Sequence, residues 1–322
     1  MAPRTKRPPF TLAGQEVPPG KRMSLELPYA RLVSGSSVAA PLVVLHGRQD
    51  GPTVWISSTV HGDEINGIEI IRELLSHLNI RQIAGTLIAA PIVNVHGFIA
   101  GDRNLPDGRD LNRSFPGSVR GSMASRIADI FIREVVSRCD CGIDLHTGSG
   151  DRVNWPQIRA GLDDEPTLEL AKVFGAPIVI NAKVRDGSLR QAASENGAIA
   201  LLFEGGEAKR FDQESIDVGV AGIRRCLAHI GMTPPVDLPA RTPLIAQTSK
   251  WTRSSRSGIL HLDVELGDRV EQGDFVAALH DPFGKRLSRI KARSSGVVIG
   301  RTHAALVNQG EAIVHIAELD DD

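Results

Sequence analysis

The sequence predicts an α/β fold in which helices cover both faces of a mixed, mostly parallel sheet, followed by a small all-β domain. Apolar, β-branched runs alternate with helical patterns over residues 40–230, and such alternation favours a sheet packed between two layers of helices. Near residue 235 a Pro-rich stretch gives way to short apolar runs separated by glycines. A chain of 322 residues can bury one large core and a smaller one.

Composition and charge divide the chain and limit its partners. Residues 1–20 are basic and Pro-rich and are expected to form a tail, residues 21–235 the main domain, and residues 240–322 the small all-β domain. With 37 basic and 38 acidic residues there is no net field to attract nucleic acid or a membrane surface. No run approaches the roughly 18 apolar residues of a membrane helix, and the N-terminus lacks a signal-peptide core, so a cytoplasmic location is expected.

The strands of the main domain are expected where short apolar runs are bounded by Pro, Gly or polar residues. The first two, at residues 21–32 and 40–47, suggest a hairpin at a sheet edge. The remaining expected strands cover residues 53–60, 85–93, 141–146, 177–180 and 198–204.

Helices are expected at residues 64–78, 122–136 and 214–227. The first shows apolar residues at helical spacing, namely Ile68, Ile71, Leu75 and Leu78. The second opens on a serine, which is a preferred helix N-cap.

Four side chains with metal or acid–base chemistry stand at the expected strand ends. His61 and Glu64 follow the strand at 53–60, His146 ends the strand at 141–146, and Glu204 closes the strand at 198–204. In open α/β sheets, ligands bind beyond the carboxyl ends of the strands. One His-x-x-Glu pair is a weak indication, but two imidazoles and a carboxylate form the set that holds a catalytic zinc and leaves a position for water. We therefore expect one zinc ion per chain.

A zinc hydrolase also needs a carboxylate outside the metal shell to take up and return a proton. Glu204 is the candidate because it directly ends an apolar strand. Glu207 is the alternative, although two glycines separate it from that strand.

The segment at residues 101–117 carries polar groups suited to an anionic substrate, namely Arg103, Arg109, Asn112 and Arg113. A guanidinium is a planar fork that pairs with a carboxylate through two parallel hydrogen bonds. The alternative is a solvated, turn-rich loop.

The motifs "HGDE", "DLNRSFPG", "DLHTGS" and "LLFEGGE" occur in this order, and together they resemble the succinylglutamate desuccinylase/aspartoacylase family, a branch of the zinc carboxypeptidase superfamily. The resemblance covers roughly residues 40–230 and implies a zinc carboxypeptidase-like fold. It also implies that the zinc ligands are His61, Glu64 and His146, and that Glu204 is the general base and acid.

The same resemblance implies roles for the residues of the polar loop. Asn112 and Arg113 would hold the substrate carboxylate, and Arg103 would polarise the scissile carbonyl, with Arg109 as the alternative for that role. Asp110 would orient a ligand histidine, which fixes the tautomer and raises the basicity of the ligand.

The stretch "DRVNWPQIRA" resembles a segment that follows the third ligand in bacterial members of the family. It makes Arg152 and Arg159 candidate substrate contacts. Trp155 is expected to be a packing residue in a loop, with a wall of the pocket as the alternative.

The C-terminal part resembles the barrel-sandwich modules of bacterial relatives. Biotinyl and lipoyl carrier domains show a similar pattern of short strands and glycines. The residues around Lys285, "PFGKRL", however, do not match the turn that is recognised by the enzymes that attach biotin or lipoate. A structural lid, or a contact between subunits of a homo-oligomer, is the favoured role.

The sequence thus predicts a zinc-dependent amidohydrolase that releases the acyl group of a small N-acylated amino acid or similar carboxylate-bearing compound. A carboxypeptidase for short peptides and an esterase for small esters are the enzymatic alternatives, and a non-catalytic metal-holding binding protein is the alternative outside enzymes. No G-x-S-x-G elbow and no Walker motif occurs in the chain, which disfavours a serine hydrolase and a P-loop NTPase.

Overall fold

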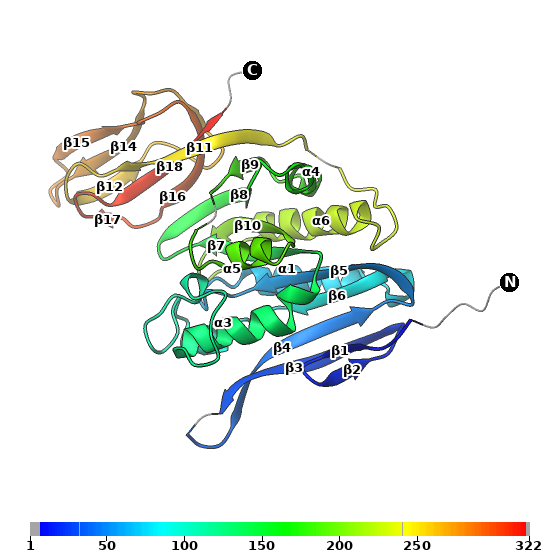
Figure 1. Cartoon of the computed structure of the whole chain (residues 1–322). Coiled ribbons are helices and arrows are strands. Elements are labelled where there is room, and N and C mark those ends of the chain that lie inside the picture. The colour runs from blue at the N-terminus through cyan, green and yellow to red at the C-terminus, as the bar shows by residue number, and fades with distance from the viewer. Residues whose placement is uncertain (1–6, 32, 184, 240, 320–322) are drawn as a thin grey trace.

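A computed structural model of the chain describes residues 7–31, 33–183, 185–239 and 241–319 (Figure 1). The first ten strands are β1 (Phe10–Leu12), β2 (Gln15–Val17), β3 (Lys21–Arg31), β4 (Ser37–His46), β5 (Gln49–Ser58), β6 (Ala84–Ala90), β7 (Cys141–Gly148), β8 (Arg152–Ala160), β9 (Ile178–Asn181) and β10 (Ile199–Glu207). The helices are α1 (Asn66–His77), α2 (Val95–Ala100), α3 (Met123–Glu134), α4 (Glu165–Phe174), α5 (Leu189–Glu195) and α6 (Gln213–His229), with 3-10 turns η1 (Ile80–Gln82), η2 (Leu111–Arg113) and η3 (Val136–Arg138). The later strands are β11 (Leu244–Arg253), β12 (Gly258–Leu262), β13 (Arg269–Val270), β14 (Phe275–His280), β15 (Arg286–Lys291), β16 (Gly296–Thr302), β17 (Leu306–Val307) and β18 (Ala312–Leu319).

One twelve-stranded mixed sheet runs through the described residues in the order β13-β16-β18-β11-β9-β8-β10-β7-β5-β6-β4-β3. Neighbouring strands in this sheet are parallel in the pairs β5–β6, β5–β7, β7–β10, β8–β9 and β9–β11. All its other neighbouring strands are antiparallel. The expectation that parallel pairs predominate is therefore not confirmed. The reason is that β8 returns antiparallel beside β10, and the C-terminal strands extend the sheet with further antiparallel pairs.

Helices cover both faces of the sheet, as the alternating pattern predicts. One buried apolar cluster joins the sheet to α1, α4 and α6, and a second joins its other face to α3 and α5. In α1 the buried apolar residues are Ile70, Ile71, Leu74 and Leu75. Ile68 and Leu78, which the spacing placed on this face, are only half-buried. Leu78 lies just beyond the helix, which ends at His77.

The N-terminal segment is not a simple tail. Residues 1–6 lie outside the described residues, but β1 and β2 pair as an antiparallel hairpin. Leu12 and Val17 of this hairpin are fully buried in the cluster that includes α3. Mostly polar residues separate Leu12 from Val17, so the sequence shows no strand pattern there.

The segment expected as a loop after the third candidate ligand is strand β8, inserted between β10 and β9. Buried polar residues, Asn154 and Gln157, interrupt its apolar pattern and hide the strand in the sequence. Trp155 packs here on an apolar cluster that includes Ile178, so its packing role holds although it lies in a strand. Helix α4 was also missed, although an Asp cap, an early proline and a closing glycine mark it.

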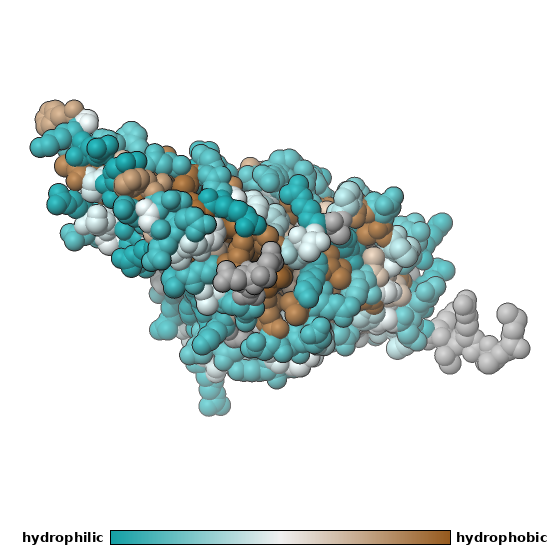
Figure 2. All heavy atoms as spheres, turned by 90° about the horizontal axis from the view of Figure 1, so that it is seen from above, coloured by the Kyte–Doolittle hydropathy of each residue, from teal (hydrophilic) through white to brown (hydrophobic). Residues whose placement is uncertain are grey.

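The described elements after residue 241 are all strands. The four-stranded sheet β15-β14-β12-β17 shares an apolar core with β13, β16 and β18, and we call residues 241–319 the β-module. The β-module continues the main sheet, because β11 pairs parallel with β9 and β16 pairs with β8. Seen from above, it projects from the body as an arm with a mostly hydrophilic surface (Figure 2). No helix in the described part of the chain is long and apolar enough to cross a membrane.

Candidate metal and substrate site

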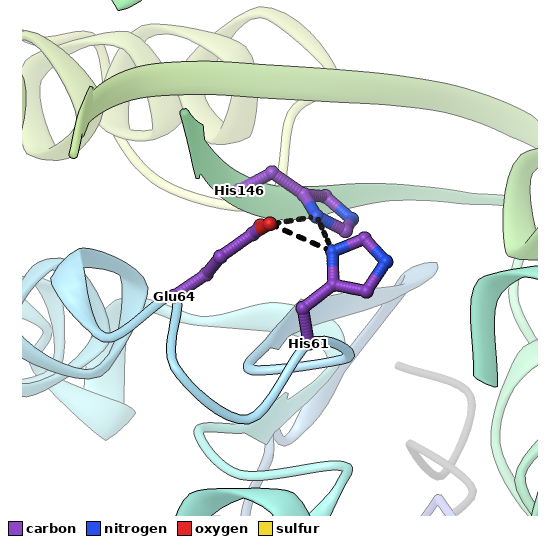
Figure 3. A group of neighbouring side chains, drawn as sticks. All are labelled: His61, Glu64 and His146. Atoms are coloured by element: carbon purple, nitrogen blue, oxygen red, sulfur yellow. Dashed lines mark hydrogen bonds and ion pairs between the residues drawn. The ribbon is translucent and has the colours of Figure 1, made fainter. Parts of the chain in front are cut away.

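The side chains of His61, Glu64 and His146 converge at one edge of the sheet (Figure 3). The Nδ1 atom of His61 lies 2.9 Å from Glu64 Oε1, and the Nδ1 atom of His146 lies 2.8 Å from Glu64 Oε2. The two Nδ1 atoms are 3.2 Å apart, and all three residues are buried. Two imidazole nitrogens and a carboxylate therefore face a common centre.

Strand pairing explains why these distant residues meet. Strands β5 and β7 are parallel neighbours, with Ser58 paired to Leu145, so their carboxyl ends lie at the same edge. Thr59, the residue after β5, has a left-handed backbone conformation (φ 57°), and its hydroxyl donates to the Pro91 carbonyl at 3.1 Å. This turn starts the short loop that carries His61 and Glu64 to the start of α1.

The second nitrogen of each histidine meets an aspartate. His61 Nε2 lies 3.1 Å from Asp110 Oδ1, and His146 Nε2 lies 2.7 Å from Asp144 Oδ2. Ser57 Oγ donates in turn to Asp144 Oδ1 at 2.7 Å. Each carboxylate thus accepts from Nε2–H and leaves Nδ1 free to bind a cation, which is how proteins prepare metal-binding histidines. Sequence reasoning missed Asp144, although it lies two residues before His146 on the same face of β7.

The electrostatics of the cluster suit a cation. Burial opposes ionisation of Glu64, but His61 and His146 outweigh it and hold the pKa of Glu64 well below its usual range. Burial also disfavours the charged form of His146, but Asp144 and Glu64 outweigh it and raise the pKa of His146 well above normal. The carboxylates thus stabilise positive charge between the ligands, and the donor set fits zinc.

Of the two arginines considered for the carbonyl, only Arg103 reaches the cluster. Its Nη1 donates to Glu64 Oε1 at 2.9 Å and its Nη2 to Asp110 Oδ2 at 3.1 Å. Arg109 instead points to the surface and pairs with Asp107 at 3.7 Å, and it does not line the cavity next to the cluster. The structure therefore does not bring Arg109 to the site.

A cavity of about 460 Å³ opens beside the cluster. Its wall includes most of the residues expected from the sequence, namely His61, Glu64, Arg103, Asn112, Arg113, His146, Arg152, Arg159 and Glu204. Residues that sequence reasoning missed complete the wall, notably Asn154, Lys183, Arg185, Arg190, Ser249, Trp251 and His315. This volume suits a small molecule.

Glu204 lies on β10 as the direct strand partner of His146. The Asn154 amide donates a hydrogen bond to its carboxylate, and Arg159 Nε lies 3.7 Å from its Oε1. Glu207, the alternative acid, does not line the cavity and pairs with Arg210 at 3.3 Å. The geometry thus places Glu204, and not Glu207, beside the candidate metal ligands.

Asn112 and Arg113 lie on the 3-10 turn η2 at the cavity wall. The Asn112 side-chain oxygen accepts from the backbone N–H of Leu189 at 2.9 Å, which ties η2 to the start of α5. Arg113 donates to the carbonyl of Asn112.

Cations are concentrated in the cavity wall. Arg159 and Arg190 are at least half-buried there, and Lys183 and Arg185 join them from the segment between β9 and α5. Burial, reinforced by Arg159, lowers the pKa of Arg190 to about 10, so it remains charged at neutral pH. The basic pattern "KVRDGSLR" after β9 could have indicated this wall from the sequence. Such a cavity favours anionic ligands.

Residues 50–230 match the model of the succinylglutamate desuccinylase/aspartoacylase catalytic domain. This region is more than half of the chain and contains the whole histidine–glutamate cluster and Glu204. The chain therefore belongs to the succinylglutamate desuccinylase/aspartoacylase family, as the sequence motifs predict.

Individual relatives extend the similarity almost to the full length of the chain. N-alpha-acetyl-L-2,4-diaminobutyric acid deacetylase of Halomonas elongata is 33% identical over 311 residues, covering 92% of this chain and 90% of that protein. The product-bound structure of the ectoine utilization protein EutE (DoeB) from Ruegeria pomeroyi matches with a TM-score of 0.82 and 28% identity, over 92% of this chain and 94% of that one. A succinylglutamate desuccinylase/aspartoacylase from Rhodobacter sphaeroides has a TM-score of 0.82 and 26% identity, over 93% and 96% of the two chains.

Proposed function

We propose that this protein is a zinc-dependent deacylase that hydrolyses the amide bond of a small N-acylated amino acid. The observation that carries this proposal is that the His61–Glu64–His146 cluster and Glu204, the strand partner of His146, line one cavity. The full-length similarity to a deacetylase of an N-acetylated amino acid supports it, and so does the cationic wall, which suits a substrate with a carboxylate.

The zinc would be held by His61 Nδ1, His146 Nδ1 and the Glu64 carboxylate. When bound there, zinc supplies a Lewis acid and makes water acidic enough to attack at neutral pH. Asp110 and Asp144 hold the two imidazoles in the tautomer that this binding needs.

The chain's own residues would then move protons and stabilise charge. Glu204 takes the proton of the attacking water and returns it to the nitrogen of the leaving amine, so one water is consumed and an acid and an amine are released. Arg103 stabilises the negative charge that develops on the carbonyl oxygen. Asn112 and Arg113 bind the substrate carboxylate and so fix the amide beside Glu204.

The decisive experiment compares Glu204→Gln with Glu207→Gln in the zinc-loaded protein. A panel of N-acetyl, N-succinyl and N-formyl amino acids identifies the substrate by amine release. We expect Glu204→Gln to lower hydrolysis by about a hundredfold or more, because it removes the proton acceptor. Zinc content, measured by elemental analysis, should stay at about one per chain in this variant.

Glu207→Gln is the matched control, since that carboxylate lies outside the cavity, and it should hydrolyse like the parent protein. His61→Ala should lose both zinc and activity. Unchanged turnover in Glu204→Gln would remove Glu204 from the mechanism, and an absence of metal-dependent amine release across the panel would overturn the proposed function.

A further inference from the structure

Strand β10 becomes irregular directly after the candidate acid. Up to Glu204 the strand is in register with both neighbours, since Glu204 pairs with His146 on β7 and with Gln157 on β8. The register then shifts on both sides, and Gly205 has no partner in either ladder. Gly205 is therefore the extra residue of a β-bulge. Bulges beside functional sites commonly fix the direction of a neighbouring side chain.

The side chain of Asn66, the first residue of α1, binds the carbonyl of this bulge. Its Nδ2 donates to the Gly205 carbonyl oxygen at 3.1 Å, and its Oδ1 accepts from the backbone N–H of Asp212 at 2.9 Å. Asn66 is fully buried. With a carbonyl on one side and an N–H on the other, only this orientation of the amide satisfies both neighbours.

The second glycine of the bulge makes this contact possible. Gly206 has a left-handed backbone conformation (φ 75°), and a Cβ atom there would lie 2.4 Å from Asn66 Nδ2 and 2.9 Å from Asp212 Cβ. Asn66 cannot move aside without losing its hydrogen bonds in a buried place. The contact therefore requires a glycine at position 206.

A backbone hydrogen bond adds a further link between the same two segments. The N–H of Lys209 donates to the carbonyl of Asp63 at 2.8 Å, and Asp63 lies between the candidate ligands His61 and Glu64. We call this bond and the two bonds of Asn66 the clasp. The clasp joins residues 61–66, which carry two of the three candidate ligands, to residues 205–212, which follow the candidate acid directly.

We propose that Asn66 is a positioning residue for Glu204, because the clasp holds the bulge after Glu204 against the loop that carries His61 and Glu64. This inference rests on the proposed deacylase function. Asn66 itself does not line the cavity, so it acts only through Glu204. Proton transfer depends on the distance between the acid and the reacting atoms, and a displacement of about 1 Å can lower a rate about a hundredfold.

Kinetics of Asn66→Ala in the zinc-loaded protein test the inference, with the substrate that amine release identifies. We expect kcat to fall about tenfold or more, because Glu204 is no longer held in place. KM should stay within about twofold of the parent value, because the substrate contacts are intact. Zinc content should remain at about one per chain, since all three ligands are present.

Matched controls separate the clasp from the general loss of a side-chain hydrogen bond. Asn196→Ala is the control for Asn66→Ala, since Asn196 Nδ2 donates to the Ala192 carbonyl at 2.7 Å at the end of α5, outside the cavity. This variant should keep the parent kcat.

Gly206→Ala breaks the clasp from its other side and should lower kcat like Asn66→Ala. Added to Asn66→Ala, it should cost little more, because the side chain that the new methyl group meets is already gone. Gly197→Ala is the control for backbone strain alone, since Gly197 has a similar φ of 81° and a Cβ there meets no atom within 4 Å.

Hydrogen exchange tests the clasp without turnover. In Asn66→Ala the N–H of Lys209 should exchange about tenfold faster, although its own acceptor is unchanged, because the linked segments separate more often. Amides within β7 should exchange as in the parent protein. If the parent protein hydrolyses no amide, the proposed function fails, while this measurement still decides whether the clasp holds the two segments together.

Parent-like kcat in both Asn66→Ala and Gly206→Ala would overturn the inference, as would unchanged exchange at Lys209. A loss of zinc in parallel with activity would also overturn it, because Asn66 would then support the metal ligands and not Glu204. Thermal melting identifies a variant that does not fold, and if Asn66→Ala is such a variant, Gly206→Ala decides the result.

Discussion

Each histidine of the candidate metal cluster is fixed at both of its ring nitrogens. The Nδ1 atoms of His61 and His146 face Glu64, while their Nε2 atoms donate to Asp110 and Asp144. The two aspartates reach the cluster by different routes. Asp144 shares a strand face with His146, because side chains two residues apart on a strand point the same way, whereas Asp110 comes from a loop distant in sequence.

Replacing Asp144 tests this arrangement at the level of one residue. Asp144→Asn keeps the shape of the side chain but removes its charge, so His146 becomes a weaker ligand, and we expect zinc affinity to fall by about 10- to 100-fold. Competition with a chelator of known affinity measures this change. The control is Asp140→Asn, whose carboxylate accepts from the Thr53 backbone N–H and does not touch the cluster. Similar zinc affinity in the two variants would refute the orienting role of Asp144.

Helix α1 positions the metal loop by packing closely on the sheet. Its second residue, Gly67, faces the strand pair formed by Ser58 and Leu145. A Cβ atom at this position would lie 2.1 Å from Ser58 Oγ and 2.8 Å from Leu145 Cβ. Only a glycine lets the helix begin this close to the strands that carry the ligands.

Gly67→Ala should therefore destabilise the protein, although replacing glycine with alanine inside a helix usually stabilises it. The gain in helix propensity is about 1 kcal/mol, while forcing extra volume into a packed contact costs about 1–3 kcal/mol. We expect a net loss of unfolding free energy in urea together with weaker zinc retention, since α1 must move away from β5. Gly161→Ala is the control, because a Cβ there meets no atom within 4 Å. A Gly67→Ala protein that is more stable than its parent would show that the neighbouring atoms make room for the added methyl group at little cost in free energy.

The body and the β-module share one continuous sheet. A buried cluster at their junction joins Ile178 and Ile180 of β9 to Ala246, Ile299 and Ala317 of the β-module. His303 of the β-module also donates its backbone N–H to the Asp151 carbonyl at 2.6 Å. Separating the two parts would expose this apolar cluster and the edges of β8 and β9.

We therefore expect the whole chain to unfold in one cooperative transition, with equal calorimetric and van't Hoff enthalpies. Ile299→Ala, at the junction, should lower the unfolding free energy of that single transition by about 2–5 kcal/mol. Leu306→Ala is the control, since Leu306 is 73% exposed on the β-module. Two separate transitions in the parent protein would show that the β-module unfolds independently.

The sequence by itself determined the candidate metal ligands and the candidate acid beside them. His61 and Glu64 follow β5, and His146 and Glu204 lie towards the carboxyl ends of β7 and β10; parallel pairing brings these ends to a common edge of the sheet. Local sequence also predicted α1 from its periodic apolar residues and α3 from its serine cap, and both signals act without reference to the rest of the chain.

Only the tertiary structure decided which other residues share the site. Arg103 and Arg109 lie six positions apart in one polar loop, and nothing local shows that the first reaches Glu64 while the second pairs with Asp107. Strand β8 was hidden because its buried polar residues are satisfied by neighbours distant in sequence, such as Glu204 for Asn154. Trp251 and His315 enter the cavity only because β11 pairs with β9, and long-range pairing of this kind leaves no periodic pattern in the sequence.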